Sequence, residues 1–446
     1  HTADFSMFRV YADKDGKPAE YSKDNVPLQP KHHLPINIKG VKENDFAMIL
    51  GYPGRTNRWM PSGGIAQNVA YAYPAWVEGA KTGMDNMNKY MKNDAAVNLK
   101  YASKYASTAN YWKNRQGMID ALTKAQTAVT KSKEEAKFNT WANKAENKEK
   151  YGNVIATIND YYAKTNLKSR HDNYLSQLMR TASYGVVPSV LGNALIAYYK
   201  ENEAKRVEML PKLNTLIENY YGEFYAPLEK DVLTAQLNLY ASRASEYGLA
   251  PVIASMKAAN NGNFAADVDK AVAGSIFATK ESVEAFMKDP KAELIATDPL
   301  YIISNDLITK IRAKSPEQLK TDDDFAIAYR KLVEGLRESK LNTIQYPDAN
   351  STLRLTYGKV RALPDDKRND AKTNNYTTMA GMVKKYKAGD AEFDLPAHLL
   401  ELNKAQDFGE YADKSGYMPV NFLTDNDITG GNSGSPVLNG KGELIG

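Results

Sequence analysis

The chain has 446 residues, enough for two or three domains, and 43% of them are apolar, which excludes a disordered chain. Its 58 lysines and arginines are mixed with 53 aspartates and glutamates, so the net charge of +5 is mild and no nucleic-acid partner is expected. The absence of cysteine excludes a disulfide scaffold, a thiolate nucleophile and a cysteine-ligated metal site, and we expect no cofactor and no metal. The longest weakly polar stretch, residues 184–199, is too short to span a bilayer.

Residues 1–58 have the pattern of strands and turns, which we interpret as part of a β-barrel. The last of these strands ends at Gly51-Tyr52-Pro53-Gly54, a sequence typical of a tight turn. Three strands and one turn are expected, at 5–11, 36–38, 46–50 and 13–17.

From residue 59 to residue 345 the pattern becomes helical. Proline and glycine become rare, and apolar residues recur at spacings of three and four. The clearest helix is expected over 315–338, where Ser315 is an N-cap, Pro316 stands in the first turn and Gln318 completes a capping box. No repeat of fixed period is found, so a solenoid is not expected.

Strand patterns return in residues 346–446. Leu353, Leu355 and Tyr357 alternate with polar residues on the opposite face, which predicts a strand. A short helix is expected at 398–403 and a strand at 420–423. The sequence therefore predicts an α+β fold, in which a large all-α domain is inserted between two parts of one barrel.

Gly430-Gly431-Asn432-Ser433-Gly434-Ser435-Pro436 is the most informative segment. Gly-Asn-Ser-Gly-Ser-Pro before a short apolar strand is typical of the nucleophile turn of trypsin-fold serine proteases. Glycines on both sides of Ser433 allow the tight turn, partly at φ > 0, that exposes its hydroxyl. The same turn can aim the N–H groups of Gly431 and Ser433 at one point, forming an oxyanion hole. The alternative is a Gly/Ser-rich hairpin without a catalytic role.

A serine nucleophile needs a base, and the base needs an orienting carboxylate. Asp4 opens the strand pattern of 5–11, a setting in which trypsin-fold proteases commonly carry their triad aspartate. We expect Asp4 to be this carboxylate. The alternative is an aspartate in an ordinary turn.

The histidine of such a triad precedes the aspartate in the trypsin fold, and only His1 does so here. On an extended strand His1 and Asp4 would point to opposite faces, because their separation is odd. We infer that the base lies outside the chain. The remaining histidines stand in settings typical of solvated or packing side chains: His32, His33, His171 and His398.

Both ends of the chain have features of a fragment. The chain opens without methionine and stops within an expected strand, just after the turn at Asn439-Gly440. We expect a piece of a larger enzyme, inactive as it stands because one triad member is missing.

Four blocks in order along the chain carry a resemblance to a known family. They are residues 1–11, beginning His1-Thr2-Ala3-Asp4; Gly51-Tyr52-Pro53-Gly54-Arg55-Thr56; Ala109-Asn110-Tyr111-Trp112-Lys113-Asn114; and Asn426-Asp427-Ile428-Thr429-Gly430 with the serine segment. The chain resembles the bacterial dipeptidyl-peptidase 7 and 11 family, which are serine exopeptidases with a chymotrypsin-like double barrel and a large helical cap.

The resemblance implies a role for each matched residue. Ser433 would be the nucleophile, Asp4 would orient the absent histidine, and the N–H groups of Gly431 and Ser433 would form the oxyanion hole. Asn110, on a cap helix, would bind the free α-amino group of the substrate and so hold its N-terminus two residues from the cut. The alternative for Asn110 is a polar residue on a helix surface. Three aromatic residues of the same region are interpreted as packing: Tyr101, Tyr105 and Trp112.

The resemblance also bears on domains and specificity. The barrel parts would be 1–58 and 346–446, and the cap would be 59–345. The family divides into enzymes that prefer Asp or Glu before the cut and enzymes that prefer apolar residues, and Ala3 favours the acidic preference. Asn432 stands where trypsin-like enzymes have an aspartate that pairs with a new N-terminus, so activation by that ion pair is not expected.

The expected activity is release of dipeptides from oligopeptides through an acyl-enzyme, in the periplasm or outside the cell. Oligopeptides are the expected partners, without nucleic acid or a membrane span, and a homodimer is left open. Two other interpretations stay open: a non-catalytic helical peptide-binding module, and a trypsin-fold endopeptidase, which would not need an anchor for the substrate amine.

Overall fold

The structure, a computed structural model, describes residues 7–341, 346–363, 376–390 and 392–446. The chain divides into two compact units. We call His1–Arg58 with Tyr346–Gly446 the strand unit, and Trp59–Gln345 the helical unit.

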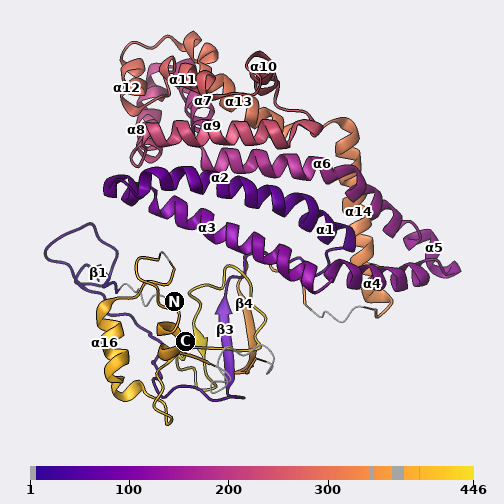
Figure 1. The fold of residues 1–446 in the computed structure, drawn as a ribbon, viewed down its shortest axis with the longest axis vertical. Helices are drawn as coiled ribbons and strands as arrows, with labels where there is room; N and C mark the ends of the chain where they lie inside the picture. The colour runs from indigo at the N-terminus through magenta and orange to yellow at the C-terminus, as the bar shows by residue number, and fades with distance from the viewer. Residues whose placement is uncertain (1–6, 342–345, 364–375, 391) are drawn as a thin grey trace. The chain divides into compact units, whose positions relative to one another are not determined.

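The helical unit consists of α-helices joined by short turns (Figure 1). Its elements are α1 (Ser62–Gln67), the π-helix η1 (Asn68–Ala72), α2 (Tyr73–Met91), α3 (Ala95–Lys124), α4 (Thr127–Ala142), α5 (Ala145–Tyr151), α6 (Val154–Thr181), η2 (Ser183–Gly185), α7 (Val187–Lys200), α8 (Glu203–Tyr221), α9 (Ala226–Arg243), η3 (Ser245–Tyr247), α10 (Pro251–Ala259), α11 (Ala265–Ala273), α12 (Lys280–Lys288), η4 (Ala292–Thr297), α13 (Pro299–Arg312) and α14 (Pro316–Glu338).

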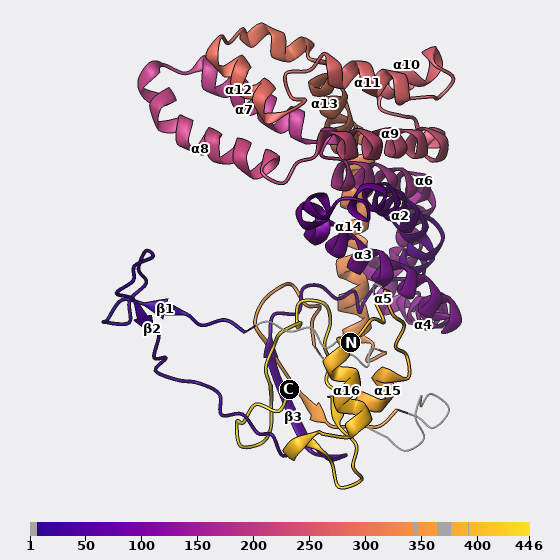
Figure 2. The same cartoon turned by 60° about the vertical axis from the view of Figure 1, so that its left-hand side comes forward.

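Long helices that pack side by side form the body of this unit. α2 packs against α3, α6 and α9, and α14 crosses α6 (Figures 1 and 2). Apolar side chains fill the spaces between the helices in three clusters, and their removal from water stabilises the unit. The largest cluster includes Met87, Leu175, Leu178, Leu233 and Leu237. A second includes Leu191, Leu195, Ile217 and Phe277, and a third includes Phe138, Tyr151, Ile158 and Leu332.

Two glycines of α2 set how closely α2 and α6 approach. A Cβ at Gly79 would lie 2.6 Å from the Cβ of Gln177, and a Cβ at Gly83 would lie 2.7 Å from the Cβ of Thr181. Gln236 of α9 donates hydrogen bonds of 2.8 Å to Gly79 O and Thr181 Oγ1 at the same contact. Because no side chain larger than hydrogen fits, the three helices are held in one register.

The capping box predicted at Ser315 is confirmed. Ser315 Oγ accepts a hydrogen bond of 3.2 Å from Gln318 N, and Gln318 Oε1 accepts one of 2.9 Å from Ser315 N. These two bonds satisfy backbone donors that the first turn of a helix leaves open. The helix α14 accordingly begins at Pro316, as the sequence predicts.

The strand unit has short strands and two helices. Its elements are β1 (Tyr11–Ala12), β2 (Val26–Pro27), β3 (Phe46–Gly51), β4 (Arg354–Lys359), β5 (Tyr376–Thr378), α15 (Met379–Val383), α16 (Ala397–Ala405), η6 (Gly409–Tyr411), β6 (Pro419–Phe422) and β7 (Val437–Leu438).

The central strand of this unit is β3, which pairs with β4 on one side and β7 on the other (Figure 1). Both pairs are antiparallel, with Leu50 opposite Leu355 and Ile49 opposite Val437. Side chains alternate between the two faces, so Ala47 and Ile49 are buried while Phe46 and Leu50 are exposed. The register places the end of β3 beside the segment that enters β7.

Several predicted elements are confirmed and others are not. The strands predicted at 46–50 and 420–423 and the helix predicted at 398–403 are present as β3, β6 and α16. The strand predicted at 36–38 is wrong, because only a single bridge from Ile36 to Leu444 is formed. Of the strand predicted at 5–11, only Tyr11 lies in a strand among the described residues. Strand propensity alone does not form a strand, since each strand needs a hydrogen-bonding partner in register.

The predicted barrel is not confirmed. The described strands form open sheets of two, three and two strands, in the orders β1-β2, β4-β3-β7 and β5-β6. None of the described helices combines the length and apolar character that crossing a bilayer requires.

Truncation of a buried leucine tests the core of the helical unit. Leu178 is fully buried, so Leu178→Ala should lower the free energy of unfolding by about 2–5 kcal/mol, through lost burial and a residual cavity. Leu99, 81% exposed on α3, is the matched control. Leu99→Ala should change the free energy of unfolding by less than about 0.5 kcal/mol. Urea unfolding followed by circular dichroism measures both; equal effects would contradict the assigned core.

Candidate active site

The turn predicted to carry a nucleophile lies directly before β7. Ser433 is exposed, Gly431 has φ of 105° and Gly434 has φ of 80°. These angles lie in the region that favours glycine. The prediction that glycines on both sides of the serine permit φ > 0 is therefore confirmed, and the turn presents the Ser433 side chain to solvent.

Asn432 braces the turn from inside. Its Oδ1 accepts a hydrogen bond of 3.3 Å from Thr429 N, and its own N–H donates to Thr429 O at 3.1 Å. Its carbonyl oxygen accepts from Ser435 N at 2.9 Å. Asn432 is buried, 9% exposed, so its amide acts in these bonds and not in solvent. Asn432 thus fixes the backbone on both sides of itself, directly before Ser433.

The segment that leaves β3 holds the turn from outside. Gly54 N donates a hydrogen bond of 2.7 Å to Gly430 O. A Cβ at Gly431 would lie 2.5 Å from Tyr52 O and 2.6 Å from Gly54 N, and a Cβ at Gly51 would lie 2.6 Å from Asn432 Nδ2. The Gly51-Tyr52-Pro53-Gly54 sequence therefore allows two stretches of backbone to approach closely.

The N–H groups predicted to form the oxyanion hole are available as donors. Within the described part of the chain, Gly431 N and Ser433 N donate to no acceptor, whereas Asn432 N between them is bonded. Asp4, the predicted orienting carboxylate, lies outside the described residues, as do His1 and Ala3.

The described histidines occupy solvated or packing positions, as predicted. His171 is 1% exposed, with Nε2 2.8 Å from the Tyr240 hydroxyl and Nδ1 2.9 Å from Asp172 Oδ1. His398 is exposed on α16, and its Nδ1 lies 3.6 Å from Glu401 Oε2. His32 and His33 are exposed. Within the strand unit, none of the three described histidines, His32, His33 and His398, has a hydrogen bond with Ser433.

The loop that leads into the serine turn is attached to β3 and β4. Asp425 Oδ1 accepts from Lys359 N at 2.6 Å, and Arg361 Nε lies 3.1 Å from Asp425 Oδ2. The hydrogen bond from Lys359 N, followed by the one from Arg361, lowers the pKa of the Asp425 carboxyl. Asn426 Nδ2 donates to Ala47 O of β3 at 3.2 Å. The loop thus enters the turn from a fixed position on the sheet.

Asn110 lies in the helical unit, exposed on α3. Its side chain makes no hydrogen bond to another described residue, whereas its neighbours on the helix are held by Arg180 of α6. Arg180 Nη2 donates to Ser107 Oγ at 3.3 Å, and its guanidinium lies 4.8 Å from the centre of the Tyr111 ring. Asn110 is therefore a solvent-facing amide on a braced helix face.

The aromatic residues near Asn110 pack between helices, as predicted. Tyr101 is 3% exposed, and its hydroxyl donates to Glu229 Oε1 at 3.0 Å and accepts from Tyr225 N at 3.1 Å. Burial, followed by the nearby Glu229 charge, raises the pKa of Tyr101. Trp112 is half-buried. Tyr101 belongs to the largest apolar cluster and Tyr105 packs against it, which confirms the prediction for these two residues.

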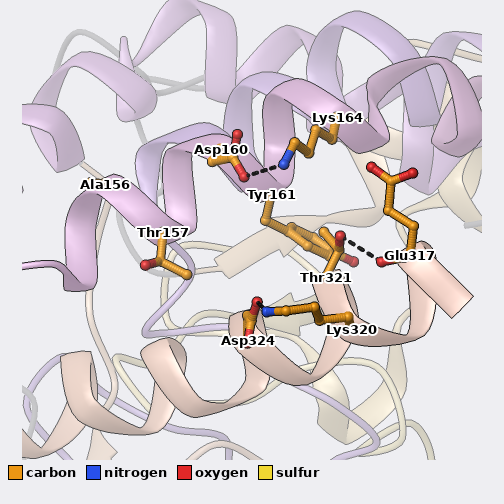
Figure 3. A pocket seen from close by; sticks show the side chains of 9 residues that line it. All are labelled: Ala156, Thr157, Asp160, Tyr161, Lys164, Glu317, Lys320, Thr321 and Asp324. Atoms are coloured by element: carbon orange, nitrogen blue, oxygen red, sulfur yellow. Dashed lines mark hydrogen bonds and ion pairs between the residues drawn. The ribbon is translucent and has the colours of Figure 1, made fainter.

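Two hollows of the helical unit are alternative candidate sites. One of about 470 Å³ lies between α6 and α14, and Figure 3 shows Tyr161 within it. Two ion pairs line it, Lys164 with Asp160 at 2.8 Å and Lys320 with Asp324 at 2.5 Å. A second hollow of about 300 Å³ is lined in part by Arg180 and Tyr101. In the second hollow Ser183 Oγ donates to Glu229 Oε1 at 2.8 Å and accepts from Lys104 Nζ at 3.1 Å. The serine turn remains the candidate site because it exposes its hydroxyl between glycines at φ > 0, beside two N–H groups that donate to no described acceptor.

No group of three or more histidine, aspartate or glutamate side chains that could hold a metal ion is found among the residues that the structure describes.

Comparison with known proteins assigns the family. A model of the family described as Peptidase S46 matches residues 1–446. The chain belongs to the peptidase S46 family. It is 51% identical over 450 residues to Dipeptidyl-peptidase 7 of Capnocytophaga gingivalis, and the match covers 100% of this chain and 62% of that relative. It is 34% identical over 463 residues to the Asp/Glu-specific dipeptidyl-peptidase of the same organism, with the same coverage.

Solved structures of a dipeptidyl peptidase named DPP11 are also similar. The crystal structure of Porphyromonas endodontalis DPP11 with the dipeptide Arg-Glu matches with a TM-score of 0.84 and 30% sequence identity, covering 98% of this chain and 62% of that one. The structure with Arg-Asp matches with a TM-score of 0.81. The chain thus spans 62% of the length of these S46 relatives.

A methyl group at Gly431 should disrupt the turn. Gly431→Ala introduces a side chain at φ of 105° and a Cβ 2.5 Å from Tyr52 O, so the turn must move away from residues 52–54. We expect faster amide exchange in peptides that cover 52–54 and 430–436, measured by hydrogen–deuterium exchange mass spectrometry. Gly430→Ala is the control, because a Cβ there meets nothing within 4 Å. Unchanged exchange in Gly431→Ala would contradict the close approach.

Proposed function

We propose that this chain carries the nucleophile and the substrate-anchoring unit of a serine dipeptidyl peptidase. The observation that carries the proposal is the turn that exposes Ser433 between Gly431 and Gly434, both at φ > 0, with the strand exit 51–54 packed against it. Membership in the S46 family and relatives named dipeptidyl-peptidases support it.

In the proposed reaction Ser433 Oγ attacks the carbonyl carbon of the peptide bond that follows the second residue of the substrate. The hydroxyl proton passes to a histidine outside this chain, which Asp4 orients. The N–H groups of Gly431 and Ser433 donate to the developing oxyanion. The C–N bond then breaks, and the amine leaves with the proton. Water hydrolyses the acyl-enzyme, releases the dipeptide and restores Ser433.

Asn110 would give the enzyme its exopeptidase character. Its carboxamide oxygen can accept a hydrogen bond from the α-ammonium of the substrate without adding charge. An enzyme that fixes the free N-terminus at a set distance from the nucleophile releases products of fixed length. In this proposal the strand unit belongs to a chymotrypsin-like barrel and the helical unit is a cap.

The preference before the cut is also open to test. Ala3 led to the expectation of an acidic preference. The relatives include chains of both names, with 51% identity to one named Dipeptidyl-peptidase 7 and 34% to one named Asp/Glu-specific, so the acidic preference stays a prediction. Paired substrates that differ only in Glu or Leu before the cut decide between the two.

Oligopeptides are the proposed substrates, and the periplasm or the cell exterior is the proposed location. A homodimer stays a prediction, which light scattering of the full-length protein checks. The 446-residue chain by itself is proposed to be inactive, since His1, the one histidine before Asp4, is not expected to act as the base of the triad.

Acetylation of the substrate tests the reaction class. The full-length protein should release dipeptides from peptides with a free N-terminus and lose this activity on N-acetylated peptides. Ser433→Ala should lower kcat by at least about 10⁴-fold. Equal cleavage of both peptides would support the endopeptidase interpretation. Peptide binding without cleavage, unchanged in Ser433→Ala, would support the non-catalytic module.

Removal of the Asn110 amide tests the substrate anchor. A hydrogen bond to a charged group contributes about 1.5–3 kcal/mol, so Asn110→Ala should lower kcat/KM on peptides with a free N-terminus by about 10- to 100-fold. Asn98→Ala is the matched control, an exposed asparagine on the same helix, and should leave kcat/KM unchanged. Equal losses in both variants would remove the assigned role of Asn110.

A further inference from the structure

Arg58 is the last residue of the strand unit before the chain passes to the helical unit. Its Nη2 lies 2.7 Å from Asp427 Oδ2, and its guanidinium carbon lies 4.8 Å from the centre of the Tyr346 ring. Its side chain is 21% exposed and that of Asp427 is 38% exposed. Both side chains are partly withdrawn from water, so solvent and salt screen this pair less than a fully exposed one.

The backbone at Arg58 is fixed as well. Arg58 N and Thr56 Oγ1 both donate to Asp348 Oδ1 at 2.7 Å. Thr56 Oγ1 in turn accepts from Ala349 N at 2.8 Å. The segment by which the chain leaves the strand unit is therefore bonded to the segment by which the chain returns.

The same pairing continues toward the serine turn. Ser351 N donates to Pro53 O at 3.0 Å, and Ser351 Oγ donates to Gly54 O at 3.2 Å. Gly54, which lies nearest the serine turn in this pairing, donates from its N–H to Gly430 O at 2.7 Å. Residues 53–58 and 346–351 thus form one hydrogen-bonded connector.

This connector holds the approach to the nucleophile at two points. Gly54 binds the loop before Ser433 at Gly430, and Arg58 binds the same loop at Asp427, three residues earlier. Asp427 N also donates to Thr356 Oγ1 of β4 at 3.1 Å. With both points fixed, residues 427–430 enter the turn in one direction.

We infer that Arg58 is a positioning residue for Ser433, which acts through Asp427. The inference rests on the proposed function. Arg58 ties the connector to the loop that leads into the nucleophile turn and so keeps the N–H groups of Gly431 and Ser433 aimed at the reacting carbonyl. The ion pair contacts neither substrate nor hydroxyl, so its loss changes the direction of the turn and leaves substrate affinity intact.

The magnitude follows from the sensitivity of catalysis to geometry. A displacement of about 1 Å at the reacting atoms costs about 100-fold in rate. Arg58→Met, which keeps the length of the side chain and removes its charge, should lower kcat of the full-length enzyme by about 10- to 100-fold, with KM unchanged within about threefold. Asp427→Asn, which keeps the shape, should have the same effect.

The experiment compares these variants by steady-state kinetics on a peptide substrate with a free N-terminus. It also measures the rate at which phenylmethanesulfonyl fluoride modifies Ser433, a second measure of hydroxyl positioning that should fall in parallel with kcat. Arg58→Lys, which keeps the charge, should restore most of kcat, and the double variant Arg58→Met/Asp427→Asn should be no worse than either single variant. Where Arg58→Met fails to fold, as judged by thermal unfolding, Asp427→Asn and Arg58→Lys carry the test.

The control is Lys387→Met, which removes an ion pair of the strand unit outside this loop, 3.0 Å from Lys387 Nζ to Asp390 Oδ2. Neither residue belongs to the connector or to the loop that leads into the serine turn, so this variant should keep kcat within about threefold. Three results would overturn the inference in an active enzyme: unchanged kcat in Arg58→Met, an equal loss in Lys387→Met, or a rise in KM alone. A wild-type enzyme that neither cleaves peptides nor is modified at Ser433 refutes the proposed function, and the inference with it.

Discussion

The hydrogen bond from Gly54 N to Gly430 O, and the absence of side chains around it, is the constraint on which the candidate site depends. Because Gly431 has no Cβ, the backbone of the serine turn lies against Tyr52 O and Gly54 N. β3 thereby sets the position of the turn, and β7, which follows the turn, pairs back onto β3. A turn held in this way presents one hydroxyl without rearrangement, as preorganised catalysis requires.

The two units divide the proposed work between them. The strand unit supplies a turn whose backbone geometry is fixed, and the helical unit supplies a rigid, solvent-facing helix that carries Asn110. Close contact of α2 and α6 makes that scaffold stiff, because the Gln177 and Thr181 side chains fill the space beside Gly79 and Gly83 and leave the helices little freedom to shift. Chemistry and substrate length are thus assigned to separate parts of the chain.

Sequence patterns were reliable where the information is local. The α14 capping box and the φ > 0 positions at Gly431 and Gly434 follow from neighbouring residues alone, and the structure confirms them. The strand predicted at 36–38 was wrong because a strand requires a partner, and the sequence does not show which segment supplies it. The barrel is a prediction of the same kind, since closure depends on pairings between distant segments.

The sequence by itself determined the alternation of strand and helical regions, the position of the exposed serine and membership in the S46 family. Only the tertiary structure decided that residues 51–54 clamp the serine turn and that Arg58 pairs with Asp427. These contacts join segments separated by the whole helical unit. Neither partner carries a local signal of the other, because an ion pair or a close backbone approach is a property of the folded chain and not of either segment.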